Sequence, residues 1–594
     1  MRPNSPMITR LLRAVILLAL TFTMAACTLI PTTGPVIHVS QSPLPTGAPP
    51  VDVEPAPPVP GANPESILAG FLTAVASGSP SRFAIARQYL TTRAAEEWDP
   101  TQSVTIYSSD GSPPIVTDQS AVLKTTVIGR VDAEGHFTAV EEPDFTHNFV
   151  ITKGVDGQWR IGDPGPGIFV SQYLFQKSFR AVAMNYFNRE FDRLVTENLY
   201  INWASVTPTA AVQALLRGPS AWLSPAALTV IPAHTKLFVE SVPVQDGVAQ
   251  VSLTQPAAGL SEDQQVQMAA QILSTLRGVA PSITGVRIDV AGVPLAVPGE
   301  DEDGVVRADA ISAYTTSVSP LSQDAYGLLP EGSVVRLPSS PAALPQPVPG
   351  GLGEPEPVWG DIPHSLAVDP AGNTLALATE SSLWLASTRS GEPANKQFDD
   401  PGLIRPQIDA GGVWTIAHEE GVPKLWLVPN RGKVVNTPLP ELEGAEIVSF
   451  RVSPDRSRIA LVARFEDAEV LGLLRISSMS PLAADGWRPL VVDTGRGTLD
   501  KCLDVGWASA MQLVVLASST KDASPVVYRL DVDAALVTSL GPVGDDTPTG
   551  LAVQPRTDNP VIMVVTGSGE VLRYEDSTRW TPLASGLATI ALPG

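Results

Sequence analysis

The chain has 594 residues, of which 44% are hydrophobic and 17% are charged. This length allows about three or four domains, and the apolar content excludes a chain that is disordered throughout. The 61 acidic residues outnumber the 39 basic ones, so the net charge is −22. A surface of this sign repels nucleic acid and anionic lipid head groups, which excludes nucleic acid as a partner.

The first 26 residues are typical of a secretory signal peptide. They contain three arginines, no acidic residue and an apolar run that is shorter than the roughly 20 residues of a membrane span. The string Met24-Ala25-Ala26-Cys27 then resembles a bacterial lipobox, in which the cysteine is diacylated after the signal has been cut. We expect Cys27 to be the lipidation site and the protein to be lipid-anchored to the cell membrane on its extracytoplasmic face. An ordinary secreted protein with an incidental cysteine is the alternative.

Residues 27–62 are predicted to be a lipid-anchored, proline-rich spacer. Ten of the residues from 28 to 62 are prolines, a composition that favours extended polyproline II. At about 3.1 Å per residue, such a spacer holds the first domain up to roughly 100 Å from the bilayer.

An N-terminal α+β domain is predicted over residues 63–165. Asn63 has the chemistry of a helix N-cap and Pro64 suits the first helical position, after which apolar residues recur on one helical face. A second helix is expected after Pro80. Alternating patterns then indicate strands over residues 104–107, 122–131, 145–153 and 159–161. Helices followed by a curved antiparallel sheet favour a cone of the NTF2-like type.

A second α+β domain is predicted over residues 166–298. At its centre Asp246-Gly247 separates two alternating apolar runs, which is a strong signal for a tight β-hairpin turn. The other expected elements are a helix that begins at Thr207, a helix over about residues 261–277 and a strand over residues 285–290.

Residues 299–594 are predicted to be an all-β propeller of five or six blades. Helix signals disappear after an acidic run at residues 300–303, and a strand-turn-strand unit recurs instead, most clearly at 365–377 and 449–461. Looser copies begin near residues 410, 504 and 550. Repeated units that begin roughly 40 to 55 residues apart are typical of four-stranded propeller blades. A β-sandwich is the alternative.

This ordered set of parts resembles one known family. The residues that carry the resemblance are the lipobox, the proline-rich spacer and the stretches 64–72, 86–91, 98–100, 159–167 and 215–289. In this order they resemble the LpqB family of actinobacterial lipoproteins, in which a GerMN domain precedes a β-propeller. The resemblance implies an association with the sensor kinase of the Mtr two-component system and with cell-envelope homeostasis.

Catalytic and metal-binding residues form no recognisable motif in the sequence. The six histidines lack metal-ligand spacing, and no nucleophile elbow, phosphate loop or complete Ser-x-x-Lys set is present. We therefore expect no catalytic residue, no cofactor, no metal and no enzymatic activity. Cys502 is expected to be a small buried side chain. Four tryptophans are expected to pack in the core rather than to stack on sugars: Trp384, Trp414, Trp426 and Trp507.

Two hypotheses of function follow. The leading one is a lipid-anchored extracytoplasmic binding protein that modulates a membrane sensor kinase of the Mtr type and cell-envelope homeostasis. Its partners are then the extracytoplasmic domain of the kinase and, through the N-terminal lipid, the membrane. The alternative is a cell-wall or carbohydrate hydrolase that uses propeller carboxylates. The hydrolase requires two carboxylates that meet in a concave pocket beside an exposed tryptophan.

Overall fold

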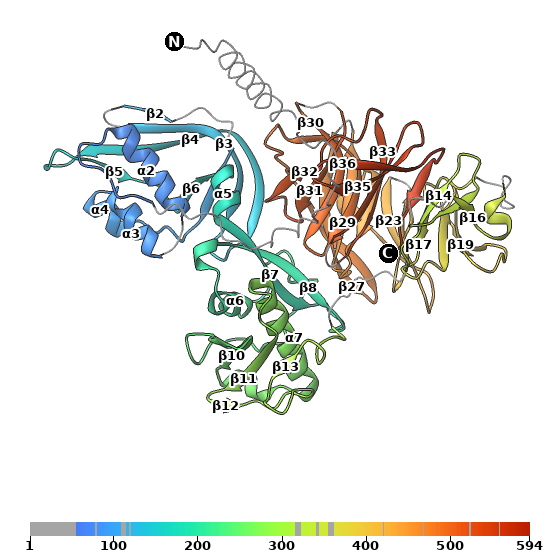
Figure 1. The fold of residues 1–594 in the computed structure, drawn as a ribbon, viewed down its shortest axis with the longest axis horizontal. Helices are drawn as coiled ribbons and strands as arrows, with labels where there is room; N and C mark the ends of the chain where they lie inside the picture. Colours follow the sequence, from blue (N-terminus) through green and yellow to red (C-terminus); the bar gives the residue numbers. More distant parts are fainter. Residues whose placement is uncertain are drawn as a thin grey trace, which may run out of the picture. The chain divides into compact units, whose positions relative to one another are not determined.

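A computed structural model gives the fold of the chain (Figure 1). It describes residues 55–77, 80–108, 114–117, 120–314, 322–339, 344–354, 362–419, 421–466, 468–521, 524–556 and 559–594. Residues Val53–Gly594 form one compact unit. The predicted signal peptide, Cys27 and the spacer up to residue 54 lie outside the described residues.

Three short helices open the first domain. They are α2 (Pro64–Ala76), α3 (Pro80–Gln88) and α4 (Thr92–Glu97). The Asn63 Oδ1 atom accepts a hydrogen bond of 2.9 Å from the Ser66 backbone N–H, so Asn63 is the N-cap of α2, as predicted. The apolar face of α2 is buried in agreement with its helical spacing: Ile67, Leu68, Phe71, Leu72 and Val75.

A six-stranded sheet shares its core with these helices. Its strands are β1 (Val104–Tyr107), β2 (Ile115–Val116), β3 (Ser120–Val131), β4 (Phe137–Lys153), β5 (Trp159–Asp163) and β6 (Ile168–Ser171). Their order is β5-β4-β3-β1-β6, with β2 paired to β3. Strand β6 pairs in parallel with β1, and the following helix α5 (Gln172–Ser178) packs into the same core. The first domain therefore extends to about residue 178, and the predicted boundary at residue 165 is too early.

A two-stranded ribbon follows the first domain and belongs to two cores. It consists of β7 (Phe179–Phe187) and β8 (Leu194–Asn202). Tyr200 packs in the core of the first domain, whereas its neighbour Leu199 packs in the core of the second domain. Because successive residues of a strand point to opposite faces, one ribbon can serve both cores.

The second domain combines two helices with a five-stranded sheet of order β12-β11-β10-β9, in which β13 also pairs with β11. Its elements are α6 (Pro208–Leu215), β9 (Val244–Gln245), β10 (Val248–Leu253), α7 (Glu262–Val279), β11 (Gly285–Val290), β12 (Val293–Pro294) and β13 (Val306–Arg307), with short 3-10 turns at Trp203–Ser205 and Gln255–Gly259. Because β13 joins this sheet and Tyr314 packs on its core, the domain continues past the predicted boundary at residue 298. The acidic run at residues 300–303 is a loop inside the domain.

The turn between β9 and β10 has the predicted hairpin geometry. The φ angles of Asp246 and Gly247 are 51° and 76°, and a type I′ turn requires both to be positive. A β-carbon at residue 247 would lie 2.9 Å from the Ser282 carbonyl oxygen, so the turn leaves no room for a side chain there.

Six four-stranded antiparallel sheets make up the C-terminal β region, residues 322–594. The first three contain β14 (Ala325–Leu328), β15 (Val334–Leu337), β16 (Gln346–Pro347) and β37 (Thr589–Ala591); β17 (Ser365–Val368), β18 (Thr374–Ala378), β19 (Ser382–Ser387) and β20 (Asn395–Asp399); and β21 (Gln407–Asp409), β22 (Gly412–Glu419), β23 (Val422–Pro429) and β24 (Val435–Pro438).

The other three sheets have the same plan. They contain β25 (Glu446–Val452), β26 (Arg458–Phe465), β27 (Ala468–Met479) and β28 (Leu482–Pro489); β29 (Leu499–Ser509), β30 (Gln512–Ser519), β31 (Val526–Asp531) and β32 (Val537–Ser539); and β33 (Pro548–Gln554), β34 (Val561–Thr566), β35 (Val571–Asp576) and β36 (Arg579–Ala584). Among the described residues of this region, the helical segments are two 3-10 turns, at Gly350–Gly353 and Pro440–Leu442.

The six sheets follow one another in a closed succession. Strand β17 contacts β21, β22 contacts β25, β25 contacts β29, and β29 contacts β33. The succession closes because β33 contacts β37, which in turn contacts β17 and pairs with β14. The first sheet is therefore completed by the last strand of the chain. The number of sheets equals the higher of the two blade numbers that the sequence predicts.

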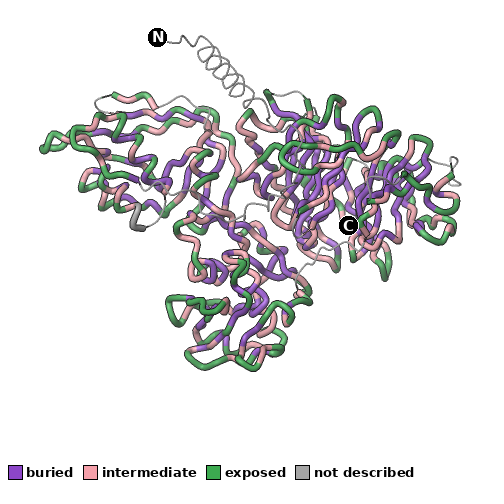
Figure 2. The backbone as a smooth tube through the Cα atoms, viewed as in Figure 1, coloured by how far each residue is buried: buried purple, intermediate pink, exposed green. Residues whose placement is uncertain are grey.

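The distribution of buried and exposed residues agrees with this arrangement of sheets. Figure 2 shows buried residues along the strands of the sheets and exposed residues mainly in the connecting loops. In the part of the chain that the structure describes, no helix is both long enough and apolar enough to cross a membrane.

Candidate functional site

The structure locates the side chains that the sequence singles out in the C-terminal β region, whereas Cys27 lies outside the described residues. Cys502 is buried in β29, and burial raises the pKa of its thiol to about 12, so this cysteine is an unreactive core residue, as predicted. Trp414 and Trp507 are buried as well, which confirms core packing for these two.

Trp384 and Trp426 are half-buried. The Trp426 ring stacks on Phe398 with centroids 4.5 Å apart, and its Nε1 donates a hydrogen bond of 2.8 Å to Asp400 Oδ2. The Lys396 ammonium lies 5.1 Å from the centroid of the Trp384 ring. Both indoles therefore already contact neighbouring side chains, which supports packing over sugar stacking.

A pocket of about 430 Å³ lies where three parts of the chain meet. Residues from the turn between β3 and β4, from β8, from the loop after α6 and from the C-terminal β region form its wall, including Asp132, His136, Glu197, Trp222, Arg458 and Asp533. Ligand sites commonly have volumes of about 300–1,000 Å³ and occur between domains. This junction pocket is therefore the candidate functional site.

Beside the junction pocket, the Tyr200 hydroxyl lies between two carboxylates. Its Oη is 2.9 Å from Asp531 Oδ2 and 2.8 Å from Asp533 Oδ1, so the cluster connects β8 to the end of β31. A phenol has one proton and can donate to one carboxylate at a time. If both contacts are hydrogen bonds, one of the two aspartates must also carry a proton.

The pKa values of the cluster change in the direction that this geometry requires. Burial, and after it the nearby charge of Asp531, raise the pKa of Asp533 to about 7. Burial also raises the pKa of Asp531, and it raises the pKa of the Tyr200 phenol well above its usual value. Near neutral pH the cluster therefore holds more protons than free aspartates would.

Arg458 is a buried cation in the wall of the junction pocket, with 3% of its side chain exposed. Its Nη2 donates to Asp455 Oδ2 at 3.1 Å and to the carbonyl oxygens of Thr196 and Ala510, each at 2.9 Å. Thr196 belongs to β8, so Arg458 is a second polar link between the ribbon and the C-terminal β region. Its Nε–H has no hydrogen-bond partner among the described residues.

Trp222 provides a third link. Its indole Nε1 donates to the Gly486 carbonyl at 2.9 Å, and Arg475 Nη1 donates to the Trp222 carbonyl at 2.6 Å. Arg488 lies 5.8 Å from the Trp222 ring and donates to the Phe137 carbonyl of the first domain at 3.1 Å. Strands β27 and β28 therefore hold residues of both α+β domains.

Tyr200 keeps Asp531 and Asp533 from serving as a pair of carboxylates for glycoside hydrolysis. The wall of the junction pocket carries acidic groups, Asp132, Glu134, Glu197 and Asp533, and basic groups, Arg217, Arg458 and Arg488. Glycoside hydrolysis needs two carboxylates on either side of the scissile bond, about 5–9 Å apart. Here the Tyr200 hydroxyl occupies the space between Asp531 and Asp533, so a sugar bond cannot lie between them.

Sequence reasoning did not find this cluster. Tyr200 lies 331 residues before Asp531 and 333 before Asp533, so no spacing rule pairs them. The local sequence feature at this place is a pair of aspartates one residue apart, in Asp531-Val532-Asp533. Solvated turns contain such pairs as well, so the feature does not indicate a buried cluster.

Three sequence profiles match the chain in positions that agree with this architecture. The profile described as "Lipoprotein LpqB, N-terminal domain" matches residues 57–176, and the profile described as "Lipoprotein LpqB beta-propeller domain" matches residues 332–593. Between them, the Germane profile, described as "Sporulation and spore germination", matches residues 184–296. The chain is thus a multidomain protein with a GerMN-like domain and a C-terminal β-rich region.

Proteins similar to this one match nearly its whole length. Lipoprotein LpqB of Cutibacterium acnes is 27% identical over 591 residues, which cover 98% of this chain and 99% of that protein. Lipoprotein LpqB of Streptomyces avermitilis is 27% identical over 573 residues, which cover 90% of each chain. The chain belongs to the LpqB family of lipoproteins, as its sequence predicts.

The chain also has a limited similarity to a solved structure. The tandem GerMN domains of the sporulation protein GerM from Bacillus subtilis match 27% of this chain and 59% of that chain, with 19% identity and a TM-score of 0.20.

Proposed function

We propose that the protein is a lipid-anchored, extracytoplasmic binding protein that modulates a membrane sensor kinase of the Mtr type and contributes to cell-envelope homeostasis. The observation that carries the proposal is the similarity to Lipoprotein LpqB over almost the full length of both chains. The Tyr200 hydroxyl between Asp531 and Asp533, beside the mixed-charge junction pocket, also favours recognition over catalysis.

The N-terminal sequence supports a membrane anchor. Met24-Ala25-Ala26-Cys27 has the lipobox pattern, and the similar proteins are named lipoproteins. Two acyl chains anchor a protein stably, whereas one gives only marginal binding. A partner on the same membrane then meets the protein at a raised effective concentration, without any new contact.

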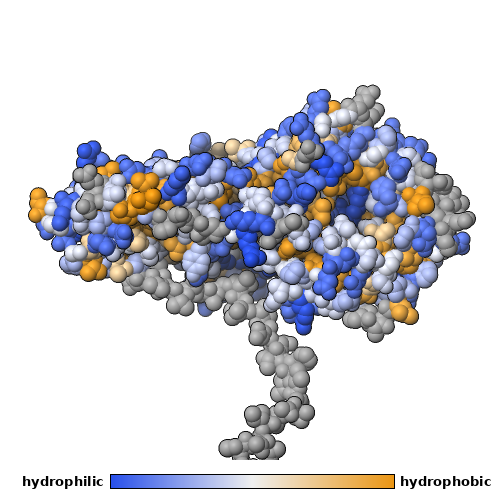
Figure 3. Space-filling view, turned by 90° about the horizontal axis from the view of Figure 1, so that it is seen from above, coloured by the Kyte–Doolittle hydropathy of each residue, from blue (hydrophilic) through white to orange (hydrophobic). Residues whose placement is uncertain are grey.

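An exposed apolar cluster on the second domain is a candidate surface for the kinase. It consists of Phe238, Val239 and Val293, which are 54%, 50% and 67% exposed. The Phe238 ring reaches the turn before β12, because a β-carbon at Gly292 would lie 3.9 Å from its Cε1 atom. On the face of the molecule in Figure 3, hydrophobic patches are small and separated by hydrophilic residues. Exposed apolar side chains that gather in one place often mark interaction surfaces.

We also propose that the six sheets are the blades of one six-bladed propeller and that the first domain is a cone of the NTF2-like type. The contacts that run from β17 through β33 to β37 and back to β17 support a ring. The irregular pairing of the long strands β3 and β4 supports a curved sheet, since β-bulges bend strands. Both folds place loops, the usual carriers of recognition, on a rigid scaffold.

Isothermal titration calorimetry tests the proposed function. The purified extracytoplasmic domain of the kinase is titrated into a soluble chain that begins at Val53, the start of the compact unit. We expect a dissociation constant in the micromolar range, which gives clear heats at about 100 μM protein. Absence of binding at that concentration, together with turnover of a wall glycan by the same preparation, would favour the hydrolase alternative instead.

A pair of variants tests the apolar cluster separately. Phe238→Ser should weaken kinase binding at least tenfold, because the variant removes the largest apolar side chain of the cluster. Tyr173→Ser is the matched control, since Tyr173 is also 54% exposed but lies on α5 of the first domain. Equal affinities of both variants and the unmodified chain would exclude the cluster as the kinase surface and leave the kinase proposal standing.

A further inference from the structure

The loop between β31 and β32 belongs to the C-terminal β region but packs on the first domain. This docking loop comprises Val532–Leu536. Ala535, which is 8% exposed, belongs to the hydrophobic core of the first domain, and Leu536 packs against the same core. The docking loop therefore joins two parts of the chain through apolar contacts.

The conformation of the docking loop depends on a carboxylate. Asp533 Oδ1 accepts a hydrogen bond of 3.1 Å from the Ala535 N–H, and the Ala534 N–H donates to the Asp531 carbonyl at 2.7 Å. Ala534 has a φ of 67°, which is unfavourable for alanine. Such a conformation persists only when the contacts around it hold it in place.

The same carboxylate contacts the Tyr200 hydroxyl. The Tyr200 ring packs in the core of the first domain, with its centroid 5.7 Å from that of Phe137 and 5.5 Å from that of Phe175. Its Oη lies 2.8 Å from Asp533 Oδ1 and 2.9 Å from Asp531 Oδ2. Both contacts are hydrogen bonds only while the three groups share two protons. When the second proton leaves, two desolvated carboxylates compete for one hydroxyl and repel each other.

The surrounding positive charges do not replace this second proton. Arg488 on β28 and Arg529 on β31 attract the two aspartates, but burial has the larger effect and raises the pKa of both. Arg488 donates to the Phe137 carbonyl at 3.1 Å, and Gln512 Nε2 donates to Asp531 at 3.2 Å without adding a charge. The junction pocket, whose wall includes Asp533, holds the other ionisable groups nearby: Asp132, Glu134, His136, Glu197, Arg217 and Arg458.

Docking of the loop is therefore coupled to uptake of a proton. In the docked state the pKa of Asp533 is about 7, whereas its usual value is 3.8. The docked state holds a proton that a solvated aspartate releases between these values, so docking is strongest at low pH. Each pH unit in this window weakens docking by up to about tenfold, and a further rise above the docked pKa has little effect.

We propose that the docking loop is a pH-dependent contact that holds the first domain on the C-terminal β region in acidic surroundings and releases it as the pH approaches neutrality. Release exposes apolar side chains on both parts, Ala535 and Leu536 on one and Phe137 on the other. The second domain keeps its link to the C-terminal β region, because the Trp222 indole and the Gly486 carbonyl do not titrate. The inference is independent of the kinase proposal.

Hydrogen exchange followed by mass spectrometry tests the docking loop in the chain that begins at Val53. Amide exchange reports local opening even when the open state is rare. After correction for the intrinsic effect of pH, protection of residues 531–540 should fall from pH 5 to pH 7, by up to about tenfold per unit, and then stay constant to pH 8. Helix α7, which packs in the second domain, should keep its protection. Equal protection of the loop at pH 5 and pH 7 would overturn the proposal.

Two variants identify the group that titrates. Asp533→Asn should make protection of the docking loop independent of pH, because the amide accepts a hydrogen bond from Tyr200 and donates one to Asp531 without a titrating proton. His136→Asn is the matched control. His136 lies on the wall of the same pocket, and histidine is the residue type that most often titrates near neutral pH, yet this variant should keep the pH dependence. Persistence of the pH dependence in Asp533→Asn, or its loss in His136→Asn, would overturn the assignment.

The distance between two spin labels tests release of the first domain. The labels are attached at Asp156→Cys in the first domain and Lys433→Cys in the C-terminal β region, two exposed positions, while the buried Cys502 stays unlabelled. Between pH 5 and pH 8 the distance distribution should broaden in this double variant and stay narrow when Asp533→Asn is added. Equal distributions at both pH values without Asp533→Asn would overturn the release of the first domain.

Discussion

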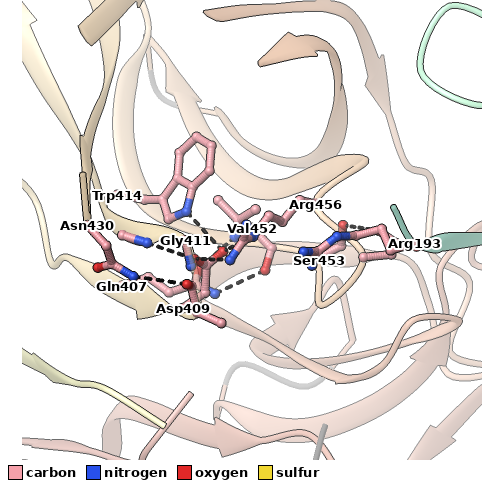
Figure 4. A network of polar contacts seen from close by, with 12 residues as sticks. Arg193, Gln407, Asp409, Gly411, Trp414, Asn430, Val452, Ser453 and Arg456 are labelled. Atoms are coloured by element: carbon pink, nitrogen blue, oxygen red, sulfur yellow. Dashed lines mark hydrogen bonds and ion pairs between the residues drawn. The ribbon is translucent and has the colours of Figure 1, made fainter. Parts of the chain in front are cut away.

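Arg456 donates two hydrogen bonds to the carboxylate of Asp409, from Nε to Oδ2 at 2.7 Å and from Nη2 to Oδ1 at 2.8 Å. Asp409 ends β21 and Arg456 lies in the turn after β25, so the pair joins two neighbouring sheets (Figure 4). The same carboxylate accepts a hydrogen bond of 3.1 Å from Trp414 Nε1. Beside it, the Gln407 amide accepts from the Val452 N–H at 2.7 Å and donates to the Val452 carbonyl at 3.1 Å.

Arg456→Gln should destabilise the C-terminal β region by about 2 kcal/mol, because it leaves the Asp409 carboxylate without its cation. The two side chains are only 15% and 17% exposed. Arg579→Gln is the control: its pair with Asp576 is 67% and 68% exposed, and its loss should cost less than about 0.5 kcal/mol. The measurement is urea unfolding followed by tryptophan fluorescence. Equal losses in the two variants would contradict a structural role for the Asp409–Arg456 pair.

Gly247→Val should destabilise the second domain by on the order of 1–3 kcal/mol. The φ of 76° is unfavourable for a β-branched residue, and the new β-carbon would lie 2.9 Å from the Ser282 carbonyl oxygen. Asp246→Asn is the control, since asparagine tolerates positive φ and should change little. Thermal melts of the chain that begins at Val53 compare the two, and an unchanged midpoint for Gly247→Val would argue against the turn.

Asp533→Asn should change the pH dependence of stability. Because the folded pKa of about 7 lies above the usual value of 3.8, the folded state binds more protons than the unfolded state between these values. The contribution of Asp533 to stability therefore falls as pH rises through this window. The unmodified chain should lose stability relative to the variant between pH 5 and pH 8, as measured by thermal unfolding.

Asp546→Asn is the control for that experiment. Hydrogen bonds from Ser568 lower the pKa of Asp546 to about 2, so its contribution is lost only as pH falls below the usual aspartate range. The difference between this variant and the unmodified chain should stay constant from pH 5 to pH 8. If Asp533→Asn behaves in the same way, the proton-sharing arrangement around Tyr200 is wrong.

Cys27→Ser should release the protein to the medium or leave an uncut precursor, because serine offers no thiol for acylation. Membrane fractionation and the mass of the N-terminal peptide measure the outcome. Mature protein that remains in the membrane fraction after this change would show that another feature anchors it.

Elements whose signals lie within a few residues were predictable from the sequence. The N-cap at Asn63 and the turn at Asp246-Gly247 follow from local backbone and side-chain chemistry, so the structure matches them. The boundaries at residues 165 and 298 were wrong because β6 and β13 are short strands. They show too little periodicity to be assigned until their pairing with β1 and β11 is seen.

The candidate site was not predictable for a different reason. The Tyr200 hydroxyl and the Asp531 and Asp533 carboxylates come together only when the ribbon packs on the C-terminal β region. Residue type and local spacing do not predict contacts between residues that are so far apart in the chain.

The pairing of β37 with β14 makes completion of the first sheet depend on residues more than 250 positions later in the chain. Strands β14, β15 and β16 are synthesised before β37, so the first sheet stays incomplete until the five other sheets have been made. Until β37 pairs, one edge of β14 keeps unpaired backbone N–H and C=O groups, which are prone to pair with other chains. A chain that stops before residue 589 would therefore keep an open sheet edge and unfold locally there.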